Sequence, residues 1–275
     1  QEGVNWGPPN LNFTSGYAGL FDAQYSANRF QTSSASANIY WNHSPHNFTY
    51  GGDYRRQQFN YLGQQDARGS FTFTGAAAKS DFGGFLLGVP DTSSIAFGNA
   101  DKYFRASVYD GYLTDDWRVN PSLTLDIGAR WEYSSPIIEK YGRLVNMDIT
   151  SGFKTAAPVV ANKPVGPLTG KSYADSLVKP VKSAFQPRIG LAWRPVAGDS
   201  MVVRAGYGVT YNTSVYQTIA VQMAQQSPLS KSLSVQNTAA NPLSLANGFL
   251  QSPNTTANTF AIDPDFRLGY THTWQ

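Results

Sequence analysis

The side chains best suited to chemistry are few in this chain. Histidine occurs only at His43, His46 and His272, and cysteine is absent. His43 and His46 are close enough in sequence to share a transition metal, but such a site needs at least one further ligand, and exposed turn histidines explain the spacing more simply. Gly198-Asp199-Ser200 could present a serine nucleophile, yet glycine and aspartate are also ordinary turn residues. The sequence therefore predicts no catalytic residue, no metal site and no cofactor.

Two acidic pairs are the remaining candidates for calcium binding or acid–base catalysis. Asp115 and Asp116 are neighbours in a predicted strand, so their side chains point to opposite faces and cannot readily share one site. We expect them to hold the end of the strand in water. Asp263 and Asp265 fall short of the number of oxygen ligands that calcium requires. We expect no enzyme activity.

The elements that would position these groups are long strands with alternating side chains. A hairpin turns at 119–121, and its second strand places one set of residues on an apolar face: Leu123, Leu125, Ile127, Ala129, Trp131 and Tyr133. A strand of roughly ten residues whose apolar face ends in Trp and Tyr is typical of a transmembrane β-strand. The alternation recurs over 185–194 and 201–212, which strengthens the prediction.

The other face of these strands carries Arg130, Arg188 and Arg204. In a membrane barrel that face borders a hydrated lumen, where arginines could attract an anionic solute. Pairing with Asp126 or Glu132 across strands is the more common role for such charges. In either role, we predict that the three arginines face the lumen.

The composition agrees with strands in a membrane. The chain has 275 residues, of which only 14% are charged, with 16 Tyr, 16 Phe and 6 Trp. This balance argues against a charge-coated cytosolic enzyme. It contains no apolar run long enough for a transmembrane helix. The net charge of +3 comes without a run of Lys or Arg, so we predict no nucleic-acid partner.

Short and long connections alternate along the chain, as they do in outer-membrane barrels with tight periplasmic turns and long extracellular loops. The short ones are expected at about 43–47, 119–121 and 195–199, and the long ones at about 62–102, 135–184 and 213–265. Within the first long loop, Ser80 to Gly88 could form one or two helical turns. About eight strands are predicted, at 27–42, 47–61, 68–74, 103–118, 122–134, 185–194, 201–212 and 266–275.

Seven short motifs occur in a particular order and spacing between residues 38 and 212. They are GGDYRR at 51–56, ARGSFTFTG at 67–75, DFGGFLLGVP at 81–90, DDWRV at 115–119, LTLDIGARWEY at 123–133, PRIGLAW at 187–193 and VRAGYG at 203–208. Together they resemble the barrel of TonB-dependent outer-membrane transporters, and in particular the Oar-like receptors that carry a carboxypeptidase-regulatory-like domain.

The resemblance implies a barrel of about 22 strands together with a plug domain and a TonB box. The sequence has no match to the plug, to the TonB box or to a signal peptide, and the predicted strand at 266–275 stops without a following turn. We therefore expect 1–275 to be part of a receptor's barrel domain, with about eight antiparallel strands of a larger all-β transmembrane barrel.

The resemblance implies that the whole protein binds and imports a scarce nutrient across the outer membrane of a Gram-negative bacterium. Its expected partners are outer-membrane lipid, a small solute of unknown identity and, where a plug is present, the TonB complex. Ligand contacts are predicted in the long loops, at Tyr141, Arg143, Tyr173, Tyr216 and Gln217. The alternatives are a self-contained eight-stranded barrel that acts as an adhesin or structural component, and a secreted all-β hydrolase or glycan-binding domain.

Overall fold

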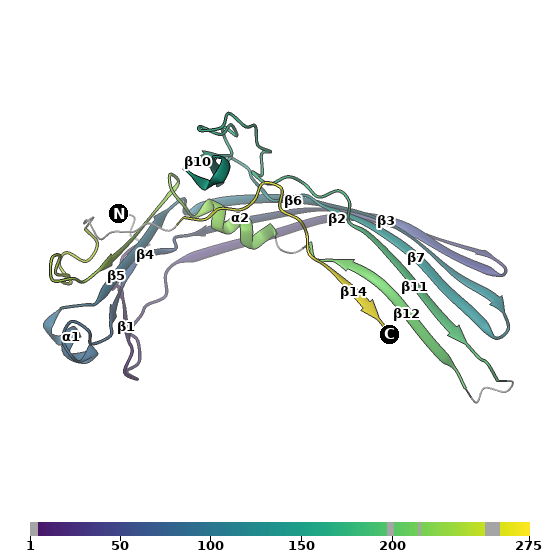
Figure 1. Cartoon of the computed structure of the whole chain (residues 1–275), viewed down its shortest axis with the longest axis horizontal. Coiled ribbons are helices and arrows are strands. Elements are labelled where there is room, and N and C mark those ends of the chain that lie inside the picture. Colours follow the sequence, from purple (N-terminus) through teal and green to yellow (C-terminus); the bar gives the residue numbers. More distant parts are fainter. Residues whose placement is uncertain (1–4, 197–200, 214–215, 251–258) are drawn as a thin grey trace.

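A long antiparallel sheet is the largest feature of the molecule. The computed structural model describes residues 5–196, 201–213, 216–250 and 259–275. Seven strands lie side by side in the order β14-β12-β11-β7-β6-β3-β2, and the short β8 pairs with β6. Figure 1 shows this sheet as a curved, open layer. Its strands are β2 (Ser26–His43), β3 (His46–Gly63), β6 (Asp101–Asn120), β7 (Leu123–Ser134), β8 (Ile138–Glu139), β11 (Phe185–Trp193), β12 (Val203–Tyr211) and β14 (Tyr270–Trp274).

Most of the predicted strands are confirmed, with ends that shift by one to a few residues. The strand predicted at 266–275 is shorter, because β14 covers only Tyr270–Trp274. The segment predicted at 68–74 does form a strand, but it belongs to a second sheet and not to the long one. The short connection predicted at 195–199 and the Gly198-Asp199-Ser200 motif lie partly or wholly outside the described residues.

The register of the long sheet keeps the side-chain alternation in phase from strand to strand. All 18 residues of β2 pair with β3, so that only Ser44 and Pro45 separate the two strands. Leu113 of β6 lies opposite both Tyr50 of β3 and Ala129 of β7. Because paired residues share a face, the strands present one common apolar face, which includes Leu113, and one common polar face, which includes Arg130. The predicted division of Leu123–Tyr133 into two faces is confirmed.

A smaller sheet lies at the end of the molecule opposite the short turns (Figure 1). It contains β1 (Asn10–Phe13), β4 (Asp66–Phe73), β5 (Thr92–Gly98) and β13 (Ser230–Gln236). Helix α1 (Asp81–Leu87) connects β4 to β5, which confirms the predicted helical turns. The Ser80 hydroxyl caps its first turn, and Gly88 ends it with φ of 69°, a conformation that favours glycine. The long loops predicted at 62–102 and 213–265 therefore contribute three of the four strands of this sheet, β4 and β5 from the first loop and β13 from the second.

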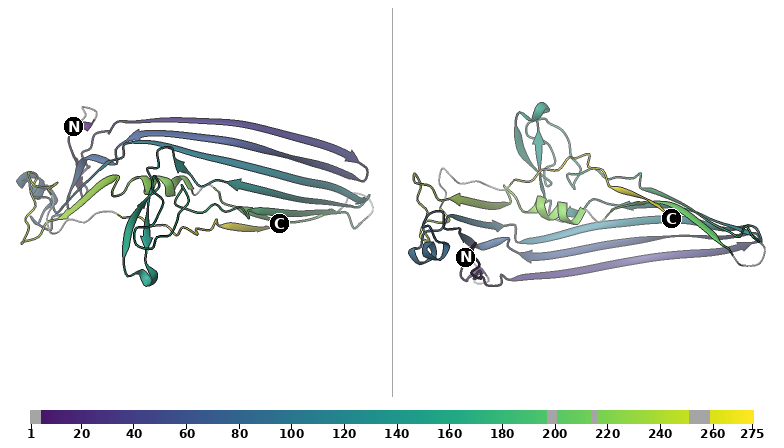
Figure 2. Two further views of the ribbon diagram at one scale, coloured as in Figure 1. Left: turned by 90° about the horizontal axis from the view of Figure 1, so that it is seen from above. Right: turned by 60° about the horizontal axis from the view of Figure 1, so that its bottom comes forward.

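The third long loop also contains regular structure. Strands β9 (Val145–Ile149) and β10 (Ala156–Val160) form a hairpin around a 3-10 turn at Ser151–Phe153, and this hairpin projects away from the long sheet (Figure 2). Helix α2 (Tyr216–Ala224) packs between the hairpin and the long sheet. Neither helix in the described part of the chain has the length and apolarity to cross a bilayer.

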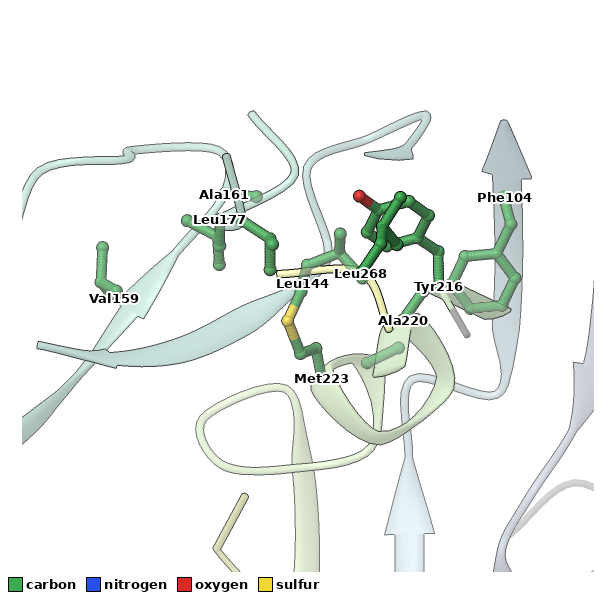
Figure 3. Close-up of a cluster of buried hydrophobic side chains, with 11 residues drawn as sticks. Phe104, Leu144, Val159, Ala161, Leu177, Tyr216, Ala220, Met223 and Leu268 are labelled. Carbon is green, nitrogen blue, oxygen red and sulfur yellow. The ribbon is translucent and has the colours of Figure 1, made fainter. Parts of the chain in front are cut away.

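The main hydrophobic core lies where α2 meets the polar face of the long sheet (Figure 3). It joins Phe104 of β6 to residues of the 138–184 loop, of α2 and of the segment before β14. Its other buried members are Leu144, Val159, Ala161, Leu177, Val178, Tyr216, Ala220, Met223, Ala224 and Leu268. This core fixes the long loops above one end of the sheet and leaves the end near the short turns uncovered.

Candidate functional site

The apolar face of the long sheet exposes a continuous set of large hydrophobic side chains. Leu113, Ile127 and Ile189, in three different strands, are each between 41% and 51% exposed. Aromatic residues on the same face are exposed as well, including Trp41, Tyr50, Tyr54, Tyr109, Trp131, Trp193, Tyr270 and Trp274. Soluble monomers rarely expose a connected apolar patch of this kind. The face is suited to an apolar environment such as lipid.

Aromatic side chains on the apolar face gather at two levels. Near the short turns, the His46 ring stacks on Trp117 and Phe48, with centroid distances of 5.2 and 5.5 Å. The second level lies eight residues before Trp117 in β6. There Tyr109 contacts Tyr54 and Tyr133, with centroid distances of 4.9 and 6.0 Å. Eight strand residues span about 26 Å, which matches the apolar band of about 25 Å in membrane barrels.

The carboxylate of Asp115 interrupts the apolar face near the short turns. Asp115 lies between Phe48 and Ile127 in the register, and its Oδ2 is 2.7 Å from Nδ1 of His46. This position corrects the prediction that Asp115 only holds the strand end in water, because its side chain is mostly covered and paired. Its neighbour Asp116 lies on the polar face opposite Asn47 and Asp126, as the alternation predicts.

The polar face carries a chain of ion pairs across three strands. Asp110 of β6 is 2.7 Å from the guanidinium of Arg130 and 3.6 Å from that of Arg55. Arg55 also contacts Asp53, and Arg130 contacts Glu132 at 3.3 Å. The Asp110 side chain is only 3% exposed, so these contacts compensate a largely desolvated carboxylate.

The other two predicted lumen arginines also belong to the polar face by register. Arg188 of β11 approaches Asp126 at 3.8 Å, a long contact between half-exposed side chains. Arg204 of β12 lies opposite Ala192 of β11 and shares that face. A cavity of about 290 Å³ lies between Arg130 and Arg188, beside Gln186 and Tyr112. The polar face therefore carries charged side chains that pair with one another across strands.

The comparison with known protein families identifies the class of this molecule. A model of the outer membrane β-barrel domain matches residues 1–275. The chain belongs to that family. No curated protein and no solved structure matches the sequence. Family membership confirms the predicted location in the bacterial outer membrane, and this location disagrees with the alternative of a secreted protein.

Two of the predicted ligand contacts in this barrel domain lie together above the sheet. Tyr141 is 55% exposed, and the guanidinium of Arg143 lies 5.1 Å from its ring centroid. Arg143 also binds the carboxylate of Glu139 at 3.0 Å. Glu139 accepts hydrogen bonds from the backbone N–H groups of Tyr103, Tyr141 and Arg143. Burial alone would raise the pKa of Glu139, but these hydrogen bonds lower it overall.

Tyr173 has a structural partner in the β9–β10 region of the barrel domain. Its hydroxyl donates to Oδ1 of Asp148 at 2.9 Å, and burial together with this bond raises the pKa of Tyr173 to about 12. Asp148 is fully buried and also accepts from the backbone N–H groups of Leu168 and Thr169. The phenol is thus held in place, and its role in ligand contact stays a prediction.

Tyr216 and Gln217 are the first two residues of helix α2, and their side chains differ in exposure to solvent. Tyr216 is 4% exposed and belongs to the hydrophobic core, whereas Gln217 is exposed. Both residues also line a cavity on the polar face. The five predicted contacts therefore fall into three separate places rather than one site.

The acids that organise the long loops and most of the residues that line this cavity could not be predicted from the sequence. Glu139 and Asp148 lie in segments without a strand or helix pattern, although the spacing of Glu139 and Arg143 is a weak signal for an ion pair. His43 stacks on Trp41, and His46 is bound to Asp115. Within the described ranges, no group of three or more histidines and carboxylates is placed to hold a metal ion.

Proposed function

We propose that this chain is one sector of the barrel of a TonB-dependent outer-membrane transporter that imports a scarce nutrient. The observation that carries the proposal is the open sheet. Among the described residues, no strand pairs with the outer edge of β2, which is 18 residues long. Unpaired backbone groups are not tolerated in the hydrocarbon region, so such an edge needs further strands.

The length of the strands and the nature of the polar face support a large barrel over a small one. β2 and β3 have 18 residues and β6 has 20, whereas about 9–11 suffice to cross a bilayer. A barrel of eight strands fills its interior with packed side chains. Here the polar face near the short turns has exposed residues such as Arg188 and small ones such as Gly190 and Gly206. This arrangement suits a wide, hydrated lumen.

The parts of the molecule then have distinct roles. Outer-membrane lipid covers the apolar face, and the solute passes along the polar face. The folded loops above the sheet, which contain Tyr141, Arg143, Tyr173, Tyr216 and Gln217, make the first ligand contacts. The inner-membrane TonB complex supplies energy through a plug. No bond is made or broken, so the protein is not an enzyme.

An immunoblot of native outer membranes tests the proposal. An antibody against residues 135–184 would recognise the projecting β9–β10 hairpin, and heated and unheated samples would be compared. We expect a heat-modifiable band at several times the 30.0 kDa of this chain. Uptake of the transported solute should then stop in cells that lack TonB.

The other outcomes of the immunoblot are equally informative. A heat-modifiable band at 30.0 kDa would contradict the transporter and support a small self-contained barrel with an adhesive or structural role. Signal in the soluble fraction alone would contradict both kinds of barrel.

A further inference from the structure

A cavity of about 270 Å³ lies on the polar face of the long sheet, beneath the start of helix α2. Two neighbouring rows of the register form its floor. The first row contains Phe30, Phe59 and Phe104, and the second contains Thr32, Gln57 and Ala106. Because residues two apart on a strand share a face, all six side chains point to the same side.

The aromatic row provides a flat apolar platform. The rings of Phe30 and Phe59 are stacked at 4.2 Å with an interplanar angle of 5°, and Phe59 continues to Phe104 at 5.9 Å. Phe104 is buried against α2, whereas Phe30 is 67% exposed at the open side of the cavity. A ligand with one apolar face could therefore stack at the Phe30 end without disturbing the core.

Four of the polar side chains around this platform are neutral and uncommitted. In the described part of the chain, the side chains of Gln57, Gln217, Thr32 and Ser134 form no hydrogen bond with another residue. Amides and hydroxyls can each donate and accept, which matches a ligand rich in hydroxyl groups.

Charged ligands fit this cavity poorly. No carboxylate lines it, so a cation has no counter-charge. The guanidinium of Arg105 is occupied, because it donates to Asn60 Oδ1 and to the carbonyl oxygen of Phe104, both at 2.8 Å. A phosphate or carboxylate would therefore have to compete for this arginine.

We propose that the cavity is a binding site for one neutral sugar ring of an oligosaccharide. The C–H face of the ring stacks on Phe30 and Phe59, and its hydroxyls bind Gln57 and Gln217. The volume of about 270 Å³ is just below the range of drug-sized pockets, which suits a single ring with the rest of the chain in the lumen. This inference rests on the proposed function, because it names the class of solute that the transporter takes up.

The test uses the native protein purified from outer membranes in detergent and applied to a printed array of neutral and anionic glycans. We expect binding to neutral glycans. Titration of the best of these by calorimetry should show at least a tenfold weaker affinity for Gln57→Ala and for Phe30→Ala. Both residues are exposed, so the heat-modifiable band should be retained and report that each variant still folds.

The neighbouring strand β2 offers a matched control. Gln31→Ala removes the same type of side chain from the opposite face of the sheet, because Gln31 pairs with Gln58 and not with Gln57, and Gln31 does not line the cavity. This control should bind the glycan as the unmodified protein does. Equal loss in Gln31→Ala and in Gln57→Ala would overturn the assignment.

Other results would overturn the site in a recognisable way. The first is an array on which no neutral glycan binds, and the second is binding to anionic glycans alone. The third is binding of a neutral acetylated tripeptide amide, detected by saturation-transfer NMR signals that Gln57→Ala abolishes. Failure of the transporter proposal looks different: glycan binding by the purified protein would persist while uptake is independent of TonB. Conversely, TonB-dependent uptake without any glycan binding would contradict only this inference.

Discussion

The two halves of strand β6 differ in what covers them. In the first half, Asp101–Asp110, six of ten residues are buried: Lys102, Phe104, Ala106, Ser107, Val108 and Asp110. In the second half, 111–120, none of the ten is buried. The strand is continuous, and it pairs with β3 from Asp101 to Trp117, across most of both halves. The difference therefore lies in what packs on the two faces and not in the backbone.

The contrast indicates two different environments for one sheet. The first half is covered by the chain's own loops and helix α2, as in a soluble protein. The second half lies between the two aromatic levels and exposes apolar groups on one side and polar groups on the other. A sheet with these two sides, placed in the outer membrane, separates lipid from a hydrated space. Folding of the first half and membrane insertion of the second should therefore respond to different substitutions.

The largest expected effect is the removal of a core side chain from the covered half. Phe104→Ala should lower the free energy of unfolding by about 3–5 kcal/mol, because the cavity between β6 and α2 cannot be refilled. Leu113→Ala, in the uncovered half, should cost clearly less, since mobile lipid can fill the space. The measurement is the urea concentration at which the folded, heat-modifiable band is lost. Equal shifts for both variants would contradict the contrast.

A charge on the apolar face should act on insertion instead. Leu113→Arg is expected to cost about 2–4 kcal/mol near the middle of the membrane and to reduce the folded band in outer-membrane fractions. The matched control is Thr114→Arg, which adds the same side chain to the opposite face of the same strand. If the control reduced insertion as strongly, the apolar face could not be the one that meets lipid.

Acid should loosen the covered half first. The pKa of Glu139 is below its ordinary value in the folded protein, so its contribution to stability is complete above that ordinary value and is lost as pH falls through the folded pKa. The protection of the backbone amides of Tyr103, Tyr141 and Arg143 against hydrogen exchange should therefore decrease below about pH 4.5. Glu139→Gln should exchange faster at neutral pH and lose this dependence. Unchanged protection down to pH 3 would contradict the role of the carboxylate.

The long sheet could be predicted from sequence because its signal is local. In Leu123–Tyr133 the alternation of apolar and polar residues fixes both the strand and its faces, and the two-residue connection at Ser44 and Pro45 fixes the register of β2 and β3. In the small sheet only β4 carries such a signal, and its pairing partners could not be predicted. β5 pairs with β13 through residues as far apart as Thr92 and Gln236, and the sequence of β13, SKSLSVQ, is short and mostly polar.

The site residues were hard to predict for the same reason. Asp148 accepts hydrogen bonds from backbone N–H groups about twenty residues away. Every residue except proline has a backbone N–H group, so the sequence does not show which of them binds a carboxylate. The cavity beneath α2 joins two register rows to a helix more than 100 residues later. Arg130, Arg188 and Arg204 could be assigned to a face because alternation alone decides it.

The smallest expected effect concerns Asp115, the carboxylate on the apolar face near the short turns. His46→Leu leaves Asp115 without its partner, and we expect a loss of about 1 kcal/mol, because the pair is partly exposed. Asp115→Leu should cost less or nothing, since it extends the apolar face between Phe48 and Ile127. The double variant should then recover what His46→Leu lost, so the two changes are not additive. Additive losses, measured by the same urea titration, would mean that the pair is incidental and that this end of the sheet lies in water, beyond the membrane.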